Sequence, residues 1–507
     1  MSSAMAFLGR AGLLALLGAL IAAPLRAAAD PVAIVTSAEA FLDRQLDKFA
    51  LPSDYPAGFE SARLIQTYDL PRPQFTGSDD PLAHRADVYD SALALITFIE
   101  AGNLVRAREL ADGLRLVQAT DPFQDGRLRA SYYANDLLAP GNSGPSIDSP
   151  DAAVGNNAWA GIALTRFYGA ATAAGFLTAA QRAHYLDSAR DIASWITAHT
   201  QRNDAFGGFS LGDDAAGNPL FGTIHARSTE HNVDAYVLAK NLAFLDPGDP
   251  AWAAMAEHAR AFVAQMFDPG TGRYWTGTRD DGSSGIEINP SPLPADAQTW
   301  TALSGVDTPA RRADALRFVA DTALGDPAAL LVEDDLGDGR AYRGLRFSTG
   351  GDRIQSEQTG GYAGAIAIGV LEGWLVSEGG EPVDKWEAEV TDVLENLDDI
   401  RLTAPGADPG GLGIVATPWP AGAFSGFEGF GDPPTYRNLR HVAGTAWPAL
   451  AARVAAGEPE ANPLHRLPEP PTLLGLAAGG ATLALLRRRA SPCPRSRRST
   501  ARPLSRS

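Results

Sequence analysis

Cysteine is almost absent from this 507-residue chain. The only one, Cys493, lies near the C-terminus, so residues 30–466 contain no disulfide, no thiol nucleophile and no cysteine metal site. A glycine-rich phosphate loop following a strand pattern is missing as well. These absences exclude thiol catalysis, thiolate metal centres and P-loop nucleotide chemistry.

Basic residues are scarce relative to acidic ones, with 42 Lys and Arg against 60 Asp and Glu. The two ends, 1–29 and 467–507, hold ten of the arginines and only one glutamate, so residues 30–466 keep 32 basic and 59 acidic residues, a net charge of −27. Nucleic acids and large polyanions require a basic footprint. We therefore expect no nucleic-acid partner.

Long apolar runs are confined to the two ends. Residues 1–29 contain Arg10, the run "AGLLALLGALIAAP" and a small-residue site, Ala27-x-Ala29, before Asp30. This order is typical of a secretory signal peptide. We therefore predict export to the cell envelope or the extracellular space.

The C-terminal segment 467–507 has an apolar run at 472–486, shorter than the roughly 20 residues of a spanning helix. Pro468-Glu469-Pro470 precede this run and three arginines, 487–489, follow it. The segment resembles a PEP-CTERM sorting signal, although eighteen residues, "ASPCPRSRRSTARPLSRS", extend beyond the arginines. The resemblance implies transient membrane anchoring of the C-terminus and an exosortase-type processing enzyme as partner.

Apolar residues recur every three to four positions in about a dozen segments, which predicts helices of two kinds. One kind is charged and amphipathic: 36–50, 104–119, 179–200, 250–267, 308–325 and 381–400. The other is rich in Ala, Gly and aromatics and should be buried on all sides: 87–102, 154–174, 229–244, 295–304, 357–377 and 440–456.

The links between the helices alternate in length. One to five residues follow an apolar helix, and 27 to 39 follow a charged one, which gives a weak repeat with a period near 70. Six hairpins with buried inner and solvated outer helices make an all-α (α/α)6 toroid of residues 30–466. Every long link then lies on the face where the inner helices begin, and long loops of this kind usually carry function.

Polar and aromatic residues gather at these inner-helix starts, so we expect one funnel lined by them. The stretch "RSTEHNVDAY" shows the pattern best, because capping accounts for only part of its polar residues. The predicted lining residues are Tyr89, Asp90, Asn157, Trp159, Glu230, His231, Asn232, Asp234, Asp296, Gln298, Trp300 and Glu357.

Acids beside tryptophans in a cleft suit glycoside hydrolysis, in which one carboxylic acid protonates the leaving oxygen and a carboxylate activates water or attacks the sugar. The stretches "VYDSALALI", "NNAWAGIAL", "STEHNVDAY", "ADAQTWTAL" and "SEQTGGYAGA" resemble inner-helix starts of the six-hairpin glycosidase superfamily. The resemblance implies a glycosidase, and the superfamily's habit favours inversion.

We predict Glu230 as the proton donor and Asp90 or Glu357 as the base. The other nine funnel residues, Tyr89 to Trp300, are predicted to bind the carbohydrate. Two carboxylates close together raise one pKa, which supplies a proton donor near neutral pH. No cofactor and no metal are expected, since the calcium-like stretch from Asp268 lacks full ligand spacing and reads as a hairpin turn.

Three alternatives stay open. A polysaccharide lyase on the same toroid would need a basic groove, for which Arg340 to Arg353 offer four arginines, and a Tyr or His base such as Tyr89 or His231. A sugar epimerase uses this architecture with histidines. A surface protein could also bind glycans without catalysis.

Overall fold

The computed structural model describes residues 30–467 apart from 53–54, 71–81, 284, 380, 383, 427–435 and 466. The predicted signal peptide, and the predicted sorting tail from residue 468 on, lie outside the described residues. Among the helices within these ranges, none combines the length and the apolar character that crossing a membrane requires.

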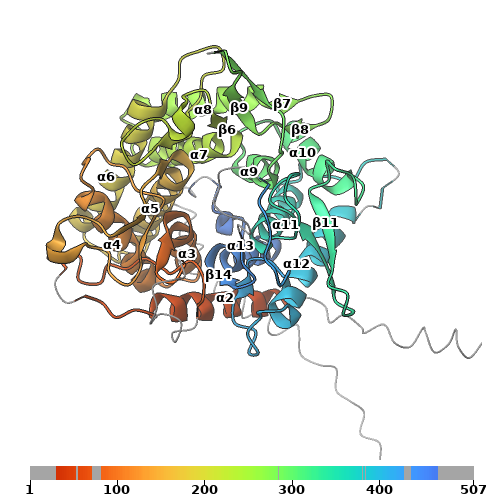
Figure 1. Ribbon diagram of the computed structural model, residues 1–507, viewed down its shortest axis with the longest axis horizontal. Helices are drawn as coiled ribbons and strands as arrows, with labels where there is room; N and C mark the ends of the chain where they lie inside the picture. Colours follow the sequence, from red (N-terminus) through yellow and green to blue (C-terminus); the bar gives the residue numbers. More distant parts are fainter. Residues whose placement is uncertain are drawn as a thin grey trace, which may run out of the picture.

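Twelve α-helices of the described chain form two concentric rings (Figure 1), which confirms the predicted (α/α)6 toroid. The outer helices are α2 (Pro31–Leu46), α4 (Leu104–Thr120), α6 (Ala179–Trp195), α8 (Pro250–Gln265), α10 (Pro309–Asp321) and α12 (Lys385–Thr403). The inner helices are α3 (Val88–Glu100), α5 (Val154–Ala173), α7 (Thr229–Leu245), α9 (Ala295–Ser304), α11 (Ser356–Leu371) and α13 (Val442–Ala455).

The inner ring closes in the order α3, α5, α7, α9, α11, α13 and back to α3. Five hairpins join each inner helix to the outer helix that follows it. The sixth pair is made by the two ends of the domain, because the first helix, α2, packs against the last, α13. The toroid therefore depends on both ends of the described chain.

Residue type separates the rings. In α11 fourteen of sixteen residues are buried, while α12 buries one face through Trp386, Val390, Val393 and Leu397. Small residues let inner helices approach closely: a Cβ on Gly360 of α11 would lie 2.7 Å from the backbone nitrogen of Pro448 in α13. Any larger residue at position 360 would push these two helices apart.

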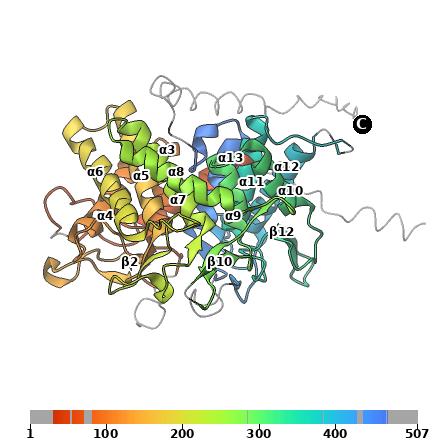
Figure 2. The ribbon, with the colours of Figure 1, turned by 90° about the horizontal axis from the view of Figure 1, so that it is seen from above.

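The long links carry only short strands, which gather on one side of the helices (Figure 2). They form six small antiparallel sheets among the described residues, two of them three-stranded, β1-β2-β3 and β10-β9-β6. The strands are β1 (Arg85–Asp87), β2 (Ser131–Tyr133), β3 (Ile147–Ser149), β4 (Ala152–Ala153), β5 (Gly212–Asp213), β6 (Arg227–Ser228), β7 (Phe267–Asp268), β8 (Arg273–Tyr274), β9 (Gly277–Asp280), β10 (Ile286–Asn289), β11 (Leu331–Asp335), β12 (Ala341–Leu345), β13 (Ile414–Val415) and β14 (Arg440–His441).

The helix boundaries differ from the prediction mainly at capped ends. Helix α2 begins at Pro31 rather than 36, because the Asp30 carboxylate accepts from the backbone N–H groups of Val32 and Ala33. Helix α11 ends at Leu371 rather than 377, and Gly373 with φ +72° turns the chain directly after it. The stretch from Asp268 is the predicted hairpin turn, between β7 and β8.

Candidate active site

The six inner helices share one register at their N-terminal ends. Counting from the first residue of each helix, the second and sixth residues are one turn apart on the same face. The fourth residue lies about 200° around the helix from the second, at 3.6 residues per turn. The polar groups of each helix start are thereby divided between two opposite faces.

The fourth residues point away from the axis and bind the backbone of the long links. Asn157 shows the pattern: its Oδ1 accepts from Leu128 N–H at 2.7 Å and its Nδ2 donates to Leu128 C=O at 2.9 Å. Side chains at the fourth position accept a link N–H in all six helices; the pairs are Ser91 with Ile65, Asn157 with Leu128, Asn232 with Phe209, Gln298 with Tyr274, Thr359 with Leu345 and Thr445 with Ile414.

This arrangement corrects three predicted sugar contacts. Asn157, Asn232 and Gln298 are fully buried, and each uses both its amide oxygen and its amide nitrogen on backbone groups. No polar atom of these side chains is left for a ligand. We therefore assign them a structural role: they tie the start of an inner helix to the link that precedes it.

The second residues face the axis, and three of them are acids on consecutive helices: Glu230 on α7, Asp296 on α9 and Glu357 on α11. Glu230 is partly exposed, while the other two are buried. Helix N-termini favour ionised carboxylates by about 0.3–1 kcal/mol. Burial outweighs this here, because the pKa of each acid is raised, first by desolvation.

The three acids differ in what else acts on them. Burial, then the charges of Asp296, Asp234 and Glu357, raise the pKa of Glu230 well above its usual range. Burial and Glu357 raise the pKa of Asp296 to about 7, against its neighbouring backbone N–H groups. Burial also raises the pKa of Glu357 to about 7, although a hydrogen bond from Tyr89 opposes the rise. All three pKa values are therefore raised, and Glu230 is the one on which three neighbouring acids act by charge.

A chain of two hydrogen bonds across three helices holds Glu357. The Trp447 indole N–H donates to the Tyr89 hydroxyl at 2.7 Å, and that hydroxyl donates to Glu357 Oε1 at 2.7 Å. Tyr89 is thus held between α13 and α11 while belonging to α3. The bond to the carboxylate stabilises its ionised form.

Three tryptophans from the sixth positions form the floor beneath the acids: Trp159 on α5, Trp300 on α9 and Trp447 on α13. Their ring centroids lie 5.2–5.8 Å apart, and Tyr89 packs on Trp159 at 5.2 Å. Trp159 and Trp300 were predicted to bind sugar. The structure brings them to the axis one helical turn below the acid ring, as we call Glu230, Asp296 and Glu357, and both indoles are buried there.

Asp234 is the sixth residue of α7, one turn below Glu230. It is fully buried, and neither carboxylate oxygen has a hydrogen bond with a described residue. Burial and then Asp296 raise its pKa well above the usual range; the Trp159 indole opposes this without the geometry of a hydrogen bond. The raised pKa favours the neutral form of Asp234, and its full burial leaves no surface that a ligand could reach.

Asp90 has a different environment from the ring acids because it is the third residue of its helix, α3, whereas each ring acid is the second residue of its helix. Its Oδ1 accepts from Ala443 N–H at 2.8 Å and lies 3.5 Å from His441 Nε2. Burial, Asp87 and Glu357 raise its pKa well above the usual range. The carboxylate joins the start of α3 to the start of α13, which is a capping role across two helices.

His231, also a third residue, lies against the neighbouring helix. A Cβ on Gly155 of α5 would come within 2.5 Å of its ring, so glycine at 155 makes room for the imidazole. Burial lowers the pKa of His231 to about 4. The ring is therefore neutral at pH 7, and its Nδ1 is a buried polar atom without a partner among the described residues.

Tyr436, in the last long link, is a further residue near the acids and was not among those predicted from the sequence. Its ring packs 5.8 Å from Phe347 and 6.4 Å from His441. Burial and then the charge of Glu357 raise the pKa of its phenol, with smaller effects of Asp296 and Glu230. Tyr436 therefore lies over the acid ring, and no helical periodicity could have indicated it.

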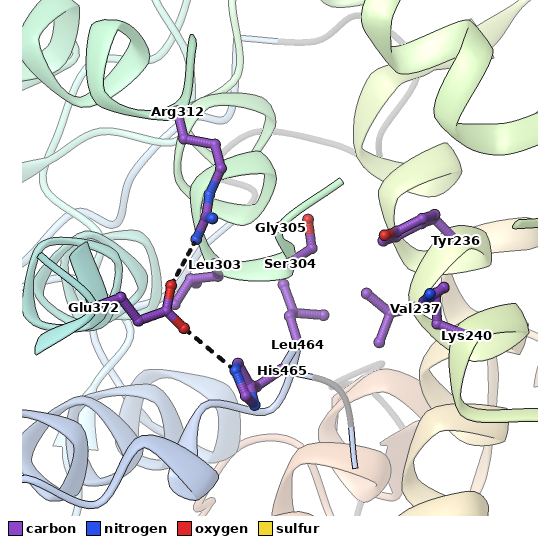
Figure 3. Close-up of a pocket in the computed structure, with 10 residues that line it drawn as sticks. All are labelled: Tyr236, Val237, Lys240, Leu303, Ser304, Gly305, Arg312, Glu372, Leu464 and His465. Carbon is purple, nitrogen blue, oxygen red and sulfur yellow. Dashed lines mark ion pairs between the residues drawn. The ribbon is translucent and has the colours of Figure 1, made fainter. Parts of the chain in front are cut away.

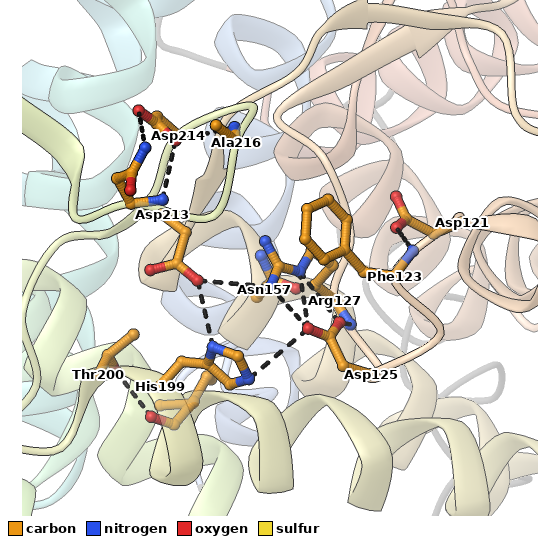
Figure 4. A network of polar contacts seen from close by, with 12 residues as sticks. Asp121, Phe123, Asp125, Arg127, Asn157, His199, Thr200, Asp213, Asp214 and Ala216 are labelled. Carbon is orange, nitrogen blue, oxygen red and sulfur yellow. Dashed lines mark hydrogen bonds and ion pairs between the residues drawn. The ribbon is translucent and has the colours of Figure 1, made fainter.

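A charged network braces two long links behind the start of α5 (Figure 4). His199 lies between two carboxylates, with Nδ1 at 3.3 Å from Asp213 and Nε2 at 3.6 Å from Asp125. The buried Arg127 pairs with the same two acids and stacks on Phe123 at 4.1 Å. These links are held independently of the acid ring.

The raised pKa of Glu357 predicts a pH dependence of stability. An acid whose pKa is higher in the folded than in the unfolded protein binds more protons in the folded state. Its contribution to the free energy of unfolding is therefore lost as the pH rises from about 4 to about 7. Glu357→Gln removes this loss. In urea unfolding at pH 5 and pH 8, we expect the variant to lose about 2 kcal/mol less stability than the wild type. Parallel pH dependences would contradict the prediction.

No protein-family model matches this chain, and neither does any curated protein. Solved structures share its fold at low identity. A family 76 glycoside hydrolase from a bovine Bacteroides thetaiotaomicron strain is 14% identical over 83% of this chain and 77% of that chain, with a TM-score of 0.50. A glycosidase variant in complex with glucose is 11% identical over 84% of this chain and 96% of that chain, with a TM-score of 0.52. A sugar epimerase from a ruminal bacterium is 12% identical over 83% of this chain and 98% of that chain, with a TM-score of 0.50.

Proposed function

We propose that this protein is an exported glycoside hydrolase that cleaves a polysaccharide or oligosaccharide with Glu230 as general acid and Glu357 as general base. The observation that carries the proposal is the acid ring: three carboxyls with raised pKa values begin three consecutive inner helices above a tryptophan floor. Two shared-fold structures, a glycoside hydrolase and a glycosidase holding glucose, support it.

Glu230 suits the acid role because its raised pKa favours the protonated form and because it is the most accessible of the ring acids. A general acid must carry its proton at working pH and release it to the leaving oxygen. Asp296, on the helix between α7 and α11, raises the pKa of Glu230 by its charge. Asp296 is therefore a positioning residue that maintains the proton donor.

Glu357 suits the base role because the Tyr89 hydroxyl stabilises its ionised form. With a pKa of about 7, Glu357 is partly ionised at neutral pH, whereas the raised pKa of Glu230 favours its protonated form. Asp90 is the weaker candidate, since its carboxylate is bound to the Ala443 backbone. We propose that Glu357 activates a water for attack and that the anomeric configuration inverts.

The lyase alternative needs a basic groove, and the four arginines suggested for it have other partners. Arg343 pairs with Glu389, and Arg353 pairs with Asp334. Arg340 pairs with Asp338, and Arg346 donates to the backbone carbonyls of the same link. The acid ring would moreover repel a uronate. We therefore favour a hydrolase on a neutral glycan.

A serine-hydrolase reading also has no support. Residues 208–212 read G-x-S-x-G, but Ser210 is buried in a long link rather than at a strand-to-helix turn. Its hydroxyl donates to Thr200 C=O at 3.3 Å and accepts from Arg202 at 2.9 Å. No histidine of the described chain bonds to it.

The test is release of reducing sugars from a panel of bacterial exopolysaccharides and plant glucans. We expect turnover on at least one neutral glycan, and early-time NMR should show a product of inverted anomeric configuration. Binding without turnover across the panel would favour a non-catalytic surface protein. An unsaturated product that absorbs ultraviolet light would favour a lyase.

Tyr89→Phe should move the acid limb of the pH–activity profile to higher pH. The variant keeps the aromatic packing but removes the hydroxyl that stabilises ionised Glu357, so the pKa of Glu357 rises. The measurement is kcat/KM as a function of pH.

The matched control is Tyr362→Phe, which removes a hydroxyl bonded to Glu389 at 3.3 Å on the outer side of α11. It should leave the profile unchanged. Equal profiles for all three proteins would reject Tyr89 as the residue that sets the ionisation of Glu357.

Export rests on sequence features outside the described residues. We propose that the leader before Asp30 is removed and that the tail from about Leu467 is processed by an exosortase-type enzyme. Glycan hydrolysis outside the cytoplasm would agree with the predicted location.

A further inference from the structure

A cavity lies at the opposite end of the toroid from the acid ring (Figure 3). Its walls come from the last part of α7 (Tyr236, Lys240), the end of α9 (Ser304), α10 (Arg312), the residue after α11 (Glu372) and the C-terminal segment (His465). Lys240 is ten residues beyond Glu230 on α7, about 15 Å along the helix. The cavity is therefore separate from the proposed active site.

Arg312 is built into the wall of this cavity. It is 7% exposed; its Nε donates to Ala302 C=O at 2.8 Å, and its guanidinium stacks on Trp374 at 4.1 Å. One terminal nitrogen lies 3.5 Å from Glu372. The other, Nη1, has no partner among the described residues and lies beside Gly305, where a Cβ would come within 3.8 Å of it.

The positive charge of the cavity exceeds the charge available to balance it. Glu372 is the acid in the wall, and it is shared between Arg312 and His465, at 3.3 Å. Those two partners and the Trp374 indole hold the pKa of Glu372 down to about 2, so its charge is already committed. Lys240 is exposed and has no ion pair with any described residue. This local excess is contrary to the chain's overall charge of −18.

The remaining wall groups suit a hydroxylated ligand. Tyr236 presents its hydroxyl, and Val237, Leu303 and Leu464 present apolar surface. The Ser304 hydroxyl is engaged with the Thr301 carbonyl and the Val306 N–H. The volume, about 220 Å³, is below the roughly 300–1,000 Å³ of sites for drug-sized ligands. A molecule of monosaccharide size would fill it.

We propose that this cavity binds a small hydroxylated anion, a sugar acid or sugar phosphate, whose charged group binds Arg312 Nη1 while Lys240, on the opposite wall (Figure 3), attracts it by charge. A guanidinium with a free N–H and an ammonium together recognise a carboxylate or phosphate through charge-assisted hydrogen bonds. The proposal does not depend on the hydrolase assignment, because no ring residue takes part.

The test is isothermal titration calorimetry of the full chain with glucuronate, glucose 6-phosphate and glucose. Lys240→Gln is the diagnostic variant, because Lys240 is exposed and its loss should not affect folding. We expect at least one anion to bind at a 1:1 ratio and to bind about fivefold or more weakly to Lys240→Gln. Glucuronate and glucose 6-phosphate distinguish a carboxylate ligand from a phosphate ligand.

The matched control is Arg260→Gln, which removes one positive charge from α8 outside the cavity, where Arg260 pairs with Glu257. It should bind the anion as the wild type does. Failure of both anions to bind, equal weakening by Lys240→Gln and Arg260→Gln, or equal binding of uncharged glucose with the same Lys240 dependence would overturn the proposal. Glycan turnover of Lys240→Gln should equal that of the wild type, so failure here is distinguishable from failure of the hydrolase assignment.

Discussion

Replacing Glu230 by glutamine should lower turnover at least 10²-fold, the low end for loss of a general acid, while binding of the glycan persists. Glutamine keeps the size and polarity of the side chain but has no proton to give to the leaving oxygen. The surrounding acids make the loss specific, since the charges of Asp296 and Glu357 help keep the Glu230 proton in place near neutral pH. The measurement is kcat and KM on the best substrate of the panel.

Glu287→Gln provides the control on the same side of the toroid. Glu287 belongs to β10, is about half exposed and pairs with Arg279 at 2.8 Å, so its loss should leave turnover unchanged. The variant proteins should also unfold at similar denaturant concentrations. A Glu230→Gln protein with full activity would end the assignment of Glu230 as proton donor.

The second large effect is on stability and separates two adjacent asparagines. Asn157→Ala leaves the N–H and C=O of Leu128 buried without their partner, at 1–3 kcal/mol for each such group, so we expect about 3 kcal/mol of destabilisation. Asn156 is partly exposed and makes no hydrogen bond with a described residue. Asn156→Ala should cost less than about 1 kcal/mol.

Chemical unfolding of the two variants and the wild type measures this difference directly. Because the residues are neighbours of the same type, helix propensity and unfolded-state effects nearly cancel between them. Equal destabilisation would show that the hydrogen bonds to Leu128 contribute nothing net. It would also remove the reason for assigning Asn232 and Gln298 a structural role.

Much of the fold could be predicted because the amino-acid composition of each helical segment indicates whether that helix is buried. The charged segments and the Ala- and Gly-rich segments alternate, and this alternation alone indicates two rings and a single face for the long links. Helix α9 was predicted with the observed bounds, 295–304. The errors at α2 and α11 arose from caps, Asp30 and the turn at Gly373, which act on single residues rather than on a periodic pattern.

The site was harder because the sequence shows that a helix start is polar but not which way each side chain points. Glu230 and Asn232 are two residues apart, yet one faces the axis and the other faces the link behind it. Aligning the six helix starts on their fourth residues would have revealed this division. The partners of Glu357 could not have been found in that way, since Tyr89 and Trp447 meet it from helices far apart in sequence.

The division of each helix start into an outward-facing support and an axis-facing group has an evolutionary consequence. The acids at the second positions can be exchanged while the fourth-position hydrogen bonds, and with them the loops, stay in place. A change of reaction at these positions would therefore cost little stability, whereas the buried tryptophans at the sixth positions would be costly to replace. On this account, drift of the reaction is easier for this scaffold than drift of its shape, and chains with 11–14% identity can still share the toroid.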